Sequence, residues 1–241
     1  MTTVSRALNG KGEISEDTVV KVRKAITEGF GLRMLTVNRG EESLSRLGLW
    51  VAAKSFDGLL VIEPEGALGA ITDARHLLDL GRRRPLMVTG PDEYGCTRER
   101  LRGFVDVYAQ AGIELDQRSI ICSDFLFDSS RGAVAQARAD GVESDAVFGH
   151  NDPSAAGVLT ALHEAGLKIP RDVAVVGFDD VEPASYICPA LTTVRRPMRE
   201  AGRQRRLCCS TTCADRPRSP PSRTTPTSLV IRGSTSQPGP N

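Results

Sequence analysis

Short apolar runs alternate with longer amphipathic segments along most of the chain. The apolar runs are typical of buried strands, whereas the amphipathic segments carry apolar residues three and four positions apart, as helices do. Strands are predicted at 32–37, 57–62, 86–89, 119–122, 145–150 and 172–178, and helices at 42–54, 71–80, 98–111, 130–140 and from 153 to the glycine at 166. Strands and helices that alternate at these lengths predict an α/β fold with doubly wound parallel sheets.

Polar residues follow two of the predicted strands at the point where each strand ends. Asn151 and Asp152 follow the strand at 145–150, and Asp179 and Asp180 follow the strand at 172–178. Because parallel strands joined by a crossover helix end at the same edge of a sheet, these four side chains are expected there together. Open α/β sheets bind ligands at this carboxyl edge. The pattern therefore predicts a ligand site at this edge.

Charge and cysteine usage narrow the functional classes. The 31 basic and 30 acidic residues nearly cancel, so no chain-wide field attracts nucleic acid or membrane, and any nucleic-acid role must be local. The six cysteines follow no disulfide or metal spacing, which favours a reducing compartment. No apolar run is long enough to span a bilayer and no export signal is visible. We expect a cytoplasmic protein with no membrane partner.

The first thirty residues are predicted to form two short helices, of which the first carries a polar face. Thr2, Ser5, Arg6 and Asn9 recur at helical spacing on one face. Short polar and cationic side chains in such an arrangement can contact base edges and phosphates in the major groove. The alternative is an amphipathic surface helix on which Arg6 is solvated.

The residues T-V-S-R-A-L-N-G that follow Thr2 resemble the recognition helix in the helix-turn-helix headpiece of LacI-family transcriptional repressors. This resemblance implies operator DNA as a partner and base or phosphate contacts by five residues: Thr2, Thr3, Ser5, Arg6 and Asn9. It also implies a homodimer. The family carries a further helix before this one and a linker after the headpiece, so the segment 1–30 resembles only part of a headpiece.

Later motifs extend the resemblance to the family's effector domain, which has two periplasmic-binding-protein-like lobes. Four short motifs each resemble a motif of the family: R-L-R-G-F, N-D, G-F-D-D and L-T-T-V. The resemblance implies effector contacts by Arg100, Asn151, Asp152 and Asp179. Carboxylate, amide and guanidinium groups suit the hydroxyls of a sugar, which is the expected effector. Three aromatic residues could offer an apolar face to a sugar ring: Phe125, Phe127 and Phe178.

Structural roles are the alternative for the same residues. Asp152 is a good candidate to cap a helix that begins at Pro153, and this role is favoured for it. Arg100 is alternatively a solvated helix residue, and Asp180 an organiser of the turn that follows it. For Arg100, Asn151 and Asp179 we favour effector contact, because three separate motifs converge on one edge.

The resemblance is interrupted at both ends of the chain. A strand and helix are missing from the amino-terminal lobe, which we expect to be trimmed. Residues 203–225 show no apolar periodicity and read as an insert or a shifted reading frame, and a terminal strand follows within 227–235. We therefore expect a partial headpiece at 1–30, an effector domain at 31–202 and a basic tail at 203–241.

Motifs for catalysis are missing from the sequence. The three histidines lie in no metal or nucleophile pattern, and no glycine-rich phosphate motif occurs. We expect no enzymatic activity, no catalytic residues, no metal and no cofactor. The predicted function is that of a LacI-type DNA-binding regulator whose operator binding responds to a sugar-like effector. The alternatives are a sugar-binding module without DNA-binding activity and an inactive, truncated regulator.

Overall fold

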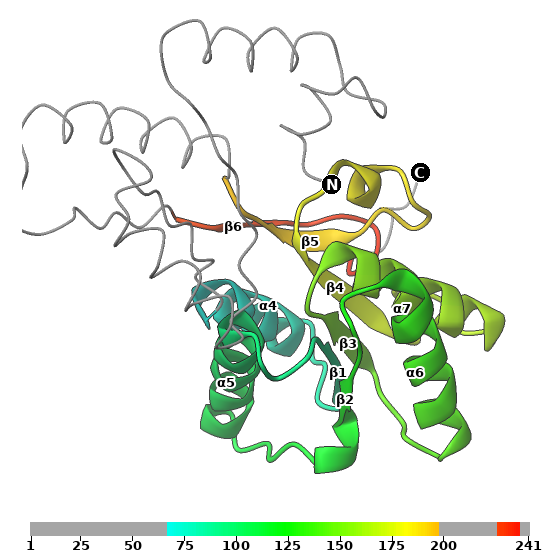
Figure 1. Ribbon diagram of the computed structural model, residues 1–241, viewed down its shortest axis with the longest axis horizontal. Coiled ribbons are helices and arrows are strands. Elements are labelled where there is room, and N and C mark those ends of the chain that lie inside the picture. The colour runs from blue at the N-terminus through cyan, green and yellow to red at the C-terminus, as the bar shows by residue number, and fades with distance from the viewer. Residues whose placement is uncertain (1–66, 198–225, 237–241) are drawn as a thin grey trace, which may run out of the picture. The chain divides into compact units, whose positions relative to one another are not determined.

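A computed structural model describes residues 67–197 and 226–236, which form a six-stranded sheet with helices on both faces (Figure 1). The helices are α4 (Ala67–Asp79), α5 (Gly95–Gln110), α6 (Phe127–Ala139) and α7 (Asp152–Glu164). The strands are β1 (Pro85–Thr89), β2 (Ile120–Cys122), β3 (Ala146–Gly149), β4 (Ala174–Asp179), β5 (Thr192–Arg195) and β6 (Ser228–Val230). Short 3-10 helices, η1 (Gln117–Ser119) and η2 (Glu182–Ser185), lie in the connections.

The strand order is β2-β1-β3-β4-β5-β6, and all neighbours are parallel except β5 and β6. From β1 the chain moves outward to β2 and then crosses back to β3, so the winding reverses between β1 and β3. This arrangement confirms the predicted doubly wound parallel sheet. The terminal strand predicted within 227–235 is β6, which closes the sheet as an antiparallel edge.

The central strands β1, β3 and β4 alternate their side chains between two apolar layers. Met87 and Phe148 point to the layer formed by α4 and α5, whereas Leu86 and Val88 point to the layer formed by α6 and α7. In Figure 1 the two helix pairs lie on opposite faces of the sheet. Burial on both faces explains why the strands read as continuous apolar runs rather than as an alternating pattern.

The predicted helix ends are confirmed more closely than the predicted starts. Gly166 has a φ of +75° after α7 and Gly81 a φ of +78° after α4, a conformation that glycine adopts without steric cost. In contrast, α5 and α6 each begin three residues earlier than predicted, and α4 is already helical at Ala67, four residues before its predicted start. The residues before α5 and α6, Tyr94 and Leu126, make no side-chain cap, so no polar signal marks these starts.

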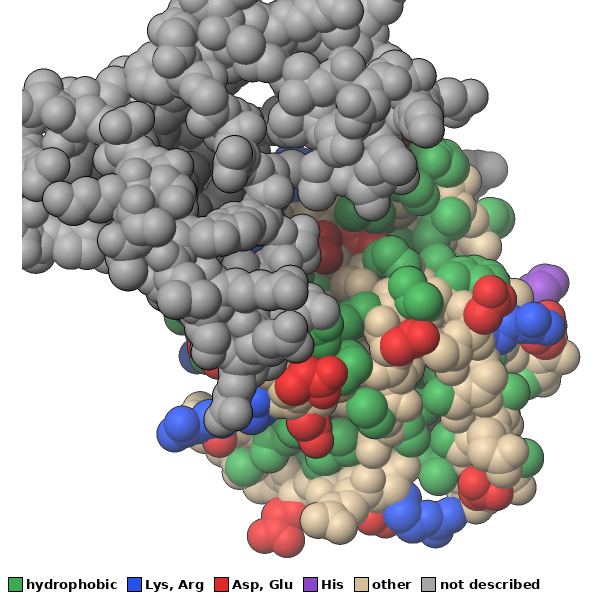
Figure 2. Space-filling view, viewed as in Figure 1, with side chains coloured by type: hydrophobic (Ala, Val, Ile, Leu, Met, Phe, Trp, Pro, Cys, Tyr) green, Lys and Arg blue, Asp and Glu red, His purple; other side chains and the backbone are tan. Residues whose placement is uncertain are grey.

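Several predictions fall outside the described residues. These are the two helices within 1–30, the strands at 32–37 and 57–62, the helix at 42–54 and the segment 203–225. None of the helices within 67–197 and 226–236 is long and apolar enough to cross a membrane. On the face seen in Figure 2, charged side chains of both signs are scattered among uncharged ones, as the near-zero net charge predicts.

Candidate functional site

Arg100 is a buried cation beside the ends of β3 and β4. It lies on α5 with only 3% of its surface exposed. Its guanidinium carbon is 3.7 Å from the centroid of the Phe178 ring, one amino group donates to the carbonyl oxygen of His150, and the other is 3.9 Å from a carboxylate oxygen of Asp179. Burial lowers the pKa of Arg100, and the Asp179 carboxylate counteracts this. The alternative of a solvated helix residue is therefore wrong.

Asn151, and not Asp152, caps α7. The Asn151 backbone is extended, with φ −150° and ψ 171°, and its side-chain oxygen accepts from the amide of Ser154 at 2.8 Å. The Asn151 amide nitrogen donates to the carbonyl of Phe125 at 3.0 Å. The prediction that Asp152 caps a helix beginning at Pro153 is wrong by one residue, because α7 already begins at Asp152.

Asp152 instead connects three elements at the carboxyl edge. Its carboxylate accepts from the amide of Val181, after β4, at 2.8 Å and from the hydroxyl of Thr193, on β5, at 2.6 Å. Burial raises the pKa of Asp152 to about 6, although these two hydrogen bonds favour the ionised form. A carboxylate at this position therefore fixes the geometry of the strand ends around it.

Asp179 and Asp180 end β4 in an unusual backbone conformation, with φ values of 111° and 55°. Asp179 accepts from Arg196 at 2.8 Å. Asp180 accepts from Arg195 at 2.5 Å and from Arg232 at 2.6 Å. Burial alone raises the pKa of Asp180, but the hydrogen bonds and charges of its two arginines outweigh it and hold the pKa below its usual value.

The structure brings the four predicted effector residues to one edge of the sheet, and it corrects the predicted aromatic platform. Phe178 is fully buried beneath Arg100 and offers no open face. Phe127 is 39% exposed at the start of α6. Phe125 packs edge-on against Tyr94, with ring centroids 5.7 Å apart. Of the three rings, Phe178 packs against the Arg100 guanidinium and is not available to a ligand.

Sequence reasoning missed two buried ionisable residues next to Arg100. Within the described residues, neither ring nitrogen of His150 and neither carboxylate oxygen of Asp73 has a hydrogen-bond partner. Burial, reinforced by the charge of Arg100, lowers the pKa of His150 to about 3. Burial, reinforced by Asp152, raises the pKa of Asp73 well above its usual value. A signal existed for Asp73, because it lies on the apolar face of α4 with Ala70 and Leu77.

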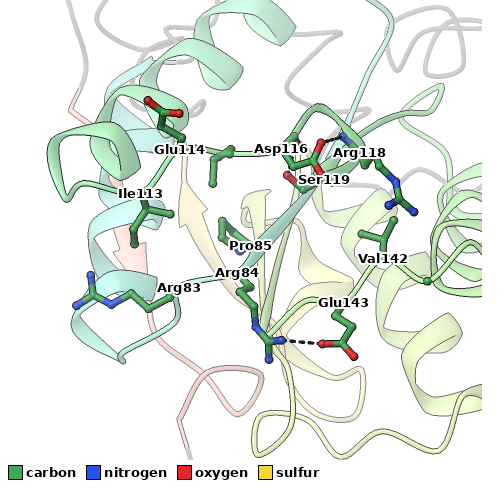
Figure 3. A pocket seen from close by; sticks show the side chains of 12 residues that line it. Arg83, Arg84, Pro85, Ile113, Glu114, Asp116, Arg118, Ser119, Val142 and Glu143 are labelled. Atoms are coloured by element: carbon green, nitrogen blue, oxygen red, sulfur yellow. Dashed lines mark hydrogen bonds and ion pairs between the residues drawn. The ribbon is translucent and has the colours of Figure 1, made fainter.

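A separate hollow of about 250 Å³ lies near the opposite, amino ends of the strands (Figure 3). Arg84 and Glu143 form an ion pair of 2.7 Å on its wall. Its lining includes residues of both charges, and none of the four predicted effector residues is among them. The hollow and the carboxyl edge are therefore distinct parts of the surface.

Residues 74–235 match the family described as a periplasmic binding protein-like domain. The ribose operon repressor of Escherichia coli K12 is 35% identical over 142 residues, which are 59% of this chain and 43% of that protein. The HTH-type transcriptional repressor CytR of the same strain is 30% identical over 177 residues, which are 73% of this chain and 52% of that protein. The chain thus spans about half the length of the curated relatives it matches.

Solved structures agree with the fold. A LacI-family regulator structure from Sanguibacter keddieii is 27% identical, with a TM-score of 0.73, and the match covers 88% of this chain and 90% of that one. The lac repressor dimer bound to operator and an anti-inducer is 21% identical, with a TM-score of 0.74 and coverage of 97% and 94%, and it supports the fold alone. The curated relatives are named as transcriptional repressors and not as enzymes, in agreement with the sequence-based expectation.

Proposed function

This chain belongs to the periplasmic binding protein-like family in its LacI-type regulator form, and we propose that it is a regulator whose operator binding responds to a small-molecule effector. In this proposal the effector is sugar-like and binds at the carboxyl edge of the sheet. The proposal also includes a cytoplasmic homodimer. The proposed divisions are 1–30 for DNA contact, 31–202 for effector binding and 203–241 for the tail.

The position of Arg100 is the main observation that supports the proposed effector site. A guanidinium is seldom buried unless its charge is used, and this one lies between Phe178 and Asp179 at the strand ends. Asn151 and Asp152 follow β3 at the same edge. A cation, an amide and carboxylates gathered at the carboxyl edge match the usual composition of a polar-ligand site in an open α/β sheet.

The names of the relatives and the sequence motifs of the first ten residues support the proposed binding of operator DNA. Both Escherichia coli relatives are named as repressors. The proposed contacts are Thr2, Thr3, Ser5, Arg6 and Asn9, which lie outside the described residues. Because a helix that reads DNA needs short polar and cationic side chains on one face, this set is suited to base and phosphate contact.

The test combines DNA binding and effector binding on the full chain. Fluorescence anisotropy measures affinity for palindromic duplexes selected from a random pool, against duplexes with scrambled half-sites, at several salt concentrations. Calorimetry measures binding of a panel of sugars. We expect a selected duplex to bind at least about tenfold more tightly than a scrambled one. We also expect one sugar to change the DNA affinity by about 5- to 150-fold.

Two variants separate the halves of the function. Asp179→Asn should change the affinity for the sugar while the preference for the selected duplex persists. Arg6→Ala should weaken DNA binding while sugar binding persists. Glu143→Gln, at the opposite edge of the sheet, is the control for a lost carboxylate. Sugar binding without any sequence preference on DNA would contradict the regulator and support a binding module, and absence of both would support an inactive chain.

A further inference from the structure

Asp179, a candidate effector contact, already accepts a hydrogen bond from Arg196. A guanidinium nitrogen of Arg196 lies 2.8 Å from a carboxylate oxygen of Asp179, and a nitrogen of Arg100 lies 3.9 Å from the same oxygen. The Asp179 and Arg196 side chains are 27% and 18% exposed, whereas Arg100 is 4% exposed. Asp179 therefore lies between a buried arginine and a second one that is partly open to solvent.

The neighbouring aspartate is paired with two more arginines. Arg195 and Arg232 both donate to Asp180, from β5 and from the residues after β6. At this corner of the sheet four arginines thus surround two adjacent aspartates. Asp152 adds a third carboxylate, but its pKa of about 6 is raised by burial, and both its oxygens already accept hydrogen bonds. Among the described residues, four arginines and three carboxylates therefore meet where β4 and β5 end.

This arrangement disfavours a neutral ligand at Asp179. To bind the Asp179 oxygen that Arg196 contacts, a sugar hydroxyl must compete with a charge-assisted hydrogen bond, which is about twice as strong as a neutral one. A phosphate or carboxylate meets the opposite situation, because it can replace Asp179 as the acceptor. The planar guanidinium fork matches both anions with two parallel hydrogen bonds. The four arginines described at this corner also favour the approach of an anion.

We propose that the effector carries a phosphate or carboxylate group, which Arg196 binds, with Arg100 behind it, in exchange for Asp179. The inference rests on the proposed effector function and specifies the chemical class of the ligand. Asp179 in this view occupies the acceptor position of the anion when no ligand is bound. The remaining hydroxyls of a sugar phosphate or sugar acid would then select among anions.

The test compares neutral and anionic forms of the same sugar on the full chain. Calorimetry measures the dissociation constants of ribose and ribose 5-phosphate, of glucose and glucose 6-phosphate, and of glucose and gluconate, together with inorganic phosphate alone. We expect at least one anionic form to bind tenfold or more tightly than its neutral partner, and this ratio to fall as salt is added. Inorganic phosphate should bind more weakly than that anionic sugar.

A matched pair of variants tests whether Arg196 causes the preference for the anionic over the neutral form of a sugar. Arg196→Gln keeps hydrogen-bond donors but removes the charge, and it should reduce the anionic-to-neutral ratio at least tenfold. Arg84→Gln removes the same charge at the opposite edge of the sheet and should leave the ratio unchanged. Both variants are first checked by thermal unfolding, so that the ratio is compared only between folded proteins.

The outcomes separate this inference from the function on which it rests. If a neutral sugar binds as tightly as its anionic form, and Arg196→Gln leaves the ratio of the two affinities unchanged, the proposal of an anionic effector is overturned. The proposed effector binding itself is then unaffected. Inorganic phosphate that binds as tightly as every sugar phosphate shows an adventitious ion only and also overturns it. No binding of any compound overturns both the anionic effector and the proposed effector site.

Discussion

Arg100 lies across the ring of Phe178, with the guanidinium carbon 3.7 Å from the ring centroid. The ring has room beneath α4 because residue 69 is a glycine, and a Cβ there would approach the Phe178 Cζ to 2.7 Å. A guanidinium over an aromatic face gains about 0.5–2 kcal/mol, more where water is excluded. The buried cation of the candidate site is thus held by α5, β4 and the close approach of α4.

Arg100→Lys should lower effector affinity by about tenfold or more. An ammonium group keeps the charge, but it loses the planar fork and much of the contact with the Phe178 ring. Calorimetry with the tightest ligand of the sugar panel measures the change. Arg102→Lys is the matched control, because Arg102 lies two residues away on α5 with 85% of its side chain exposed. Equal affinity losses in both variants would contradict a specific role for Arg100.

His150 should make the fold sensitive to mild acid. Its pKa is lowered to about 3 in the folded protein, whereas an unfolded histidine binds a proton near pH 6.5. Between these values the unfolded state holds the extra proton, so the free energy of unfolding falls as pH falls, by up to about 1.4 kcal/mol per pH unit. Above pH 6.5 the effect is absent.

Urea unfolding of the wild type and of His150→Leu between pH 4 and pH 8 measures this dependence. The variant should show a shallower loss of stability below pH 6.5, since it removes the buried imidazole and keeps an apolar side chain. His163→Leu is the control, because His163 is exposed on α7 and its loss leaves the buried imidazole in place. Parallel stability curves for wild type and His150→Leu would contradict the prediction.

Asp73→Ala should stabilise the protein at pH 8 by about 1–3 kcal/mol, the usual cost of a buried polar group without a hydrogen bond, since the Asp73 carboxyl makes none within the described residues. Burial raises the pKa of Asp73 well above its usual value, so the folded state holds a proton that the unfolded state releases. Wild-type stability therefore falls as pH rises above the unfolded pKa, and the gain in the variant should shrink toward pH 4. Asp79→Ala, exposed on the same helix, is the control. A destabilised Asp73→Ala at pH 8 would refute this account.

Gly157→Ala should destabilise the packing of α6 against α7. A Cβ at residue 157 would collide with the carbonyl oxygen of Phe127 and approach the amide of Arg131 to 3.0 Å, and backbone atoms cannot move aside easily. Overpacking of this kind costs about 1–3 kcal/mol. Gly132→Ala on α6 meets no atom within 4 Å and should instead stabilise by about 0.5–1 kcal/mol. Thermal unfolding of both variants checks the opposite signs.

Much of the candidate site was predictable because its residues follow strands. Asn151 and Asp179 come directly after apolar runs, and parallel pairing of β3 with β4 necessarily brings such positions to one edge. The assignment of the cap was not predictable to one residue. Asn151 and Asp152 both cap helices well, and only the backbone conformation at residue 151 decides between them.

The partners of these residues could not be predicted. Asp152 accepts from Thr193, which is 41 residues away, and Asp180 accepts from Arg232, which is 52 residues away. No local pattern encodes such distances. The burial of Arg100 could not be predicted either, because it depends on residues that are distant in the sequence. The residues next to an arginine on a helix do not tell whether its side chain is solvated or covered by the end of a strand.

The amino-acid sequence alone predicted the described α-helices and every described strand except β5, together with the glycines that end the helices and the polar residues at the strand ends. These features depend on periodicity and local backbone preference. Tertiary packing set which arginine pairs with which aspartate. Packing also placed Phe178 under Arg100 and buried the Asp73 carboxyl and the His150 ring, which have no hydrogen-bond partner within the described residues. Burial and ion pairing depend on the elements that pack around a residue, and the sheet brings these together from distant parts of the chain.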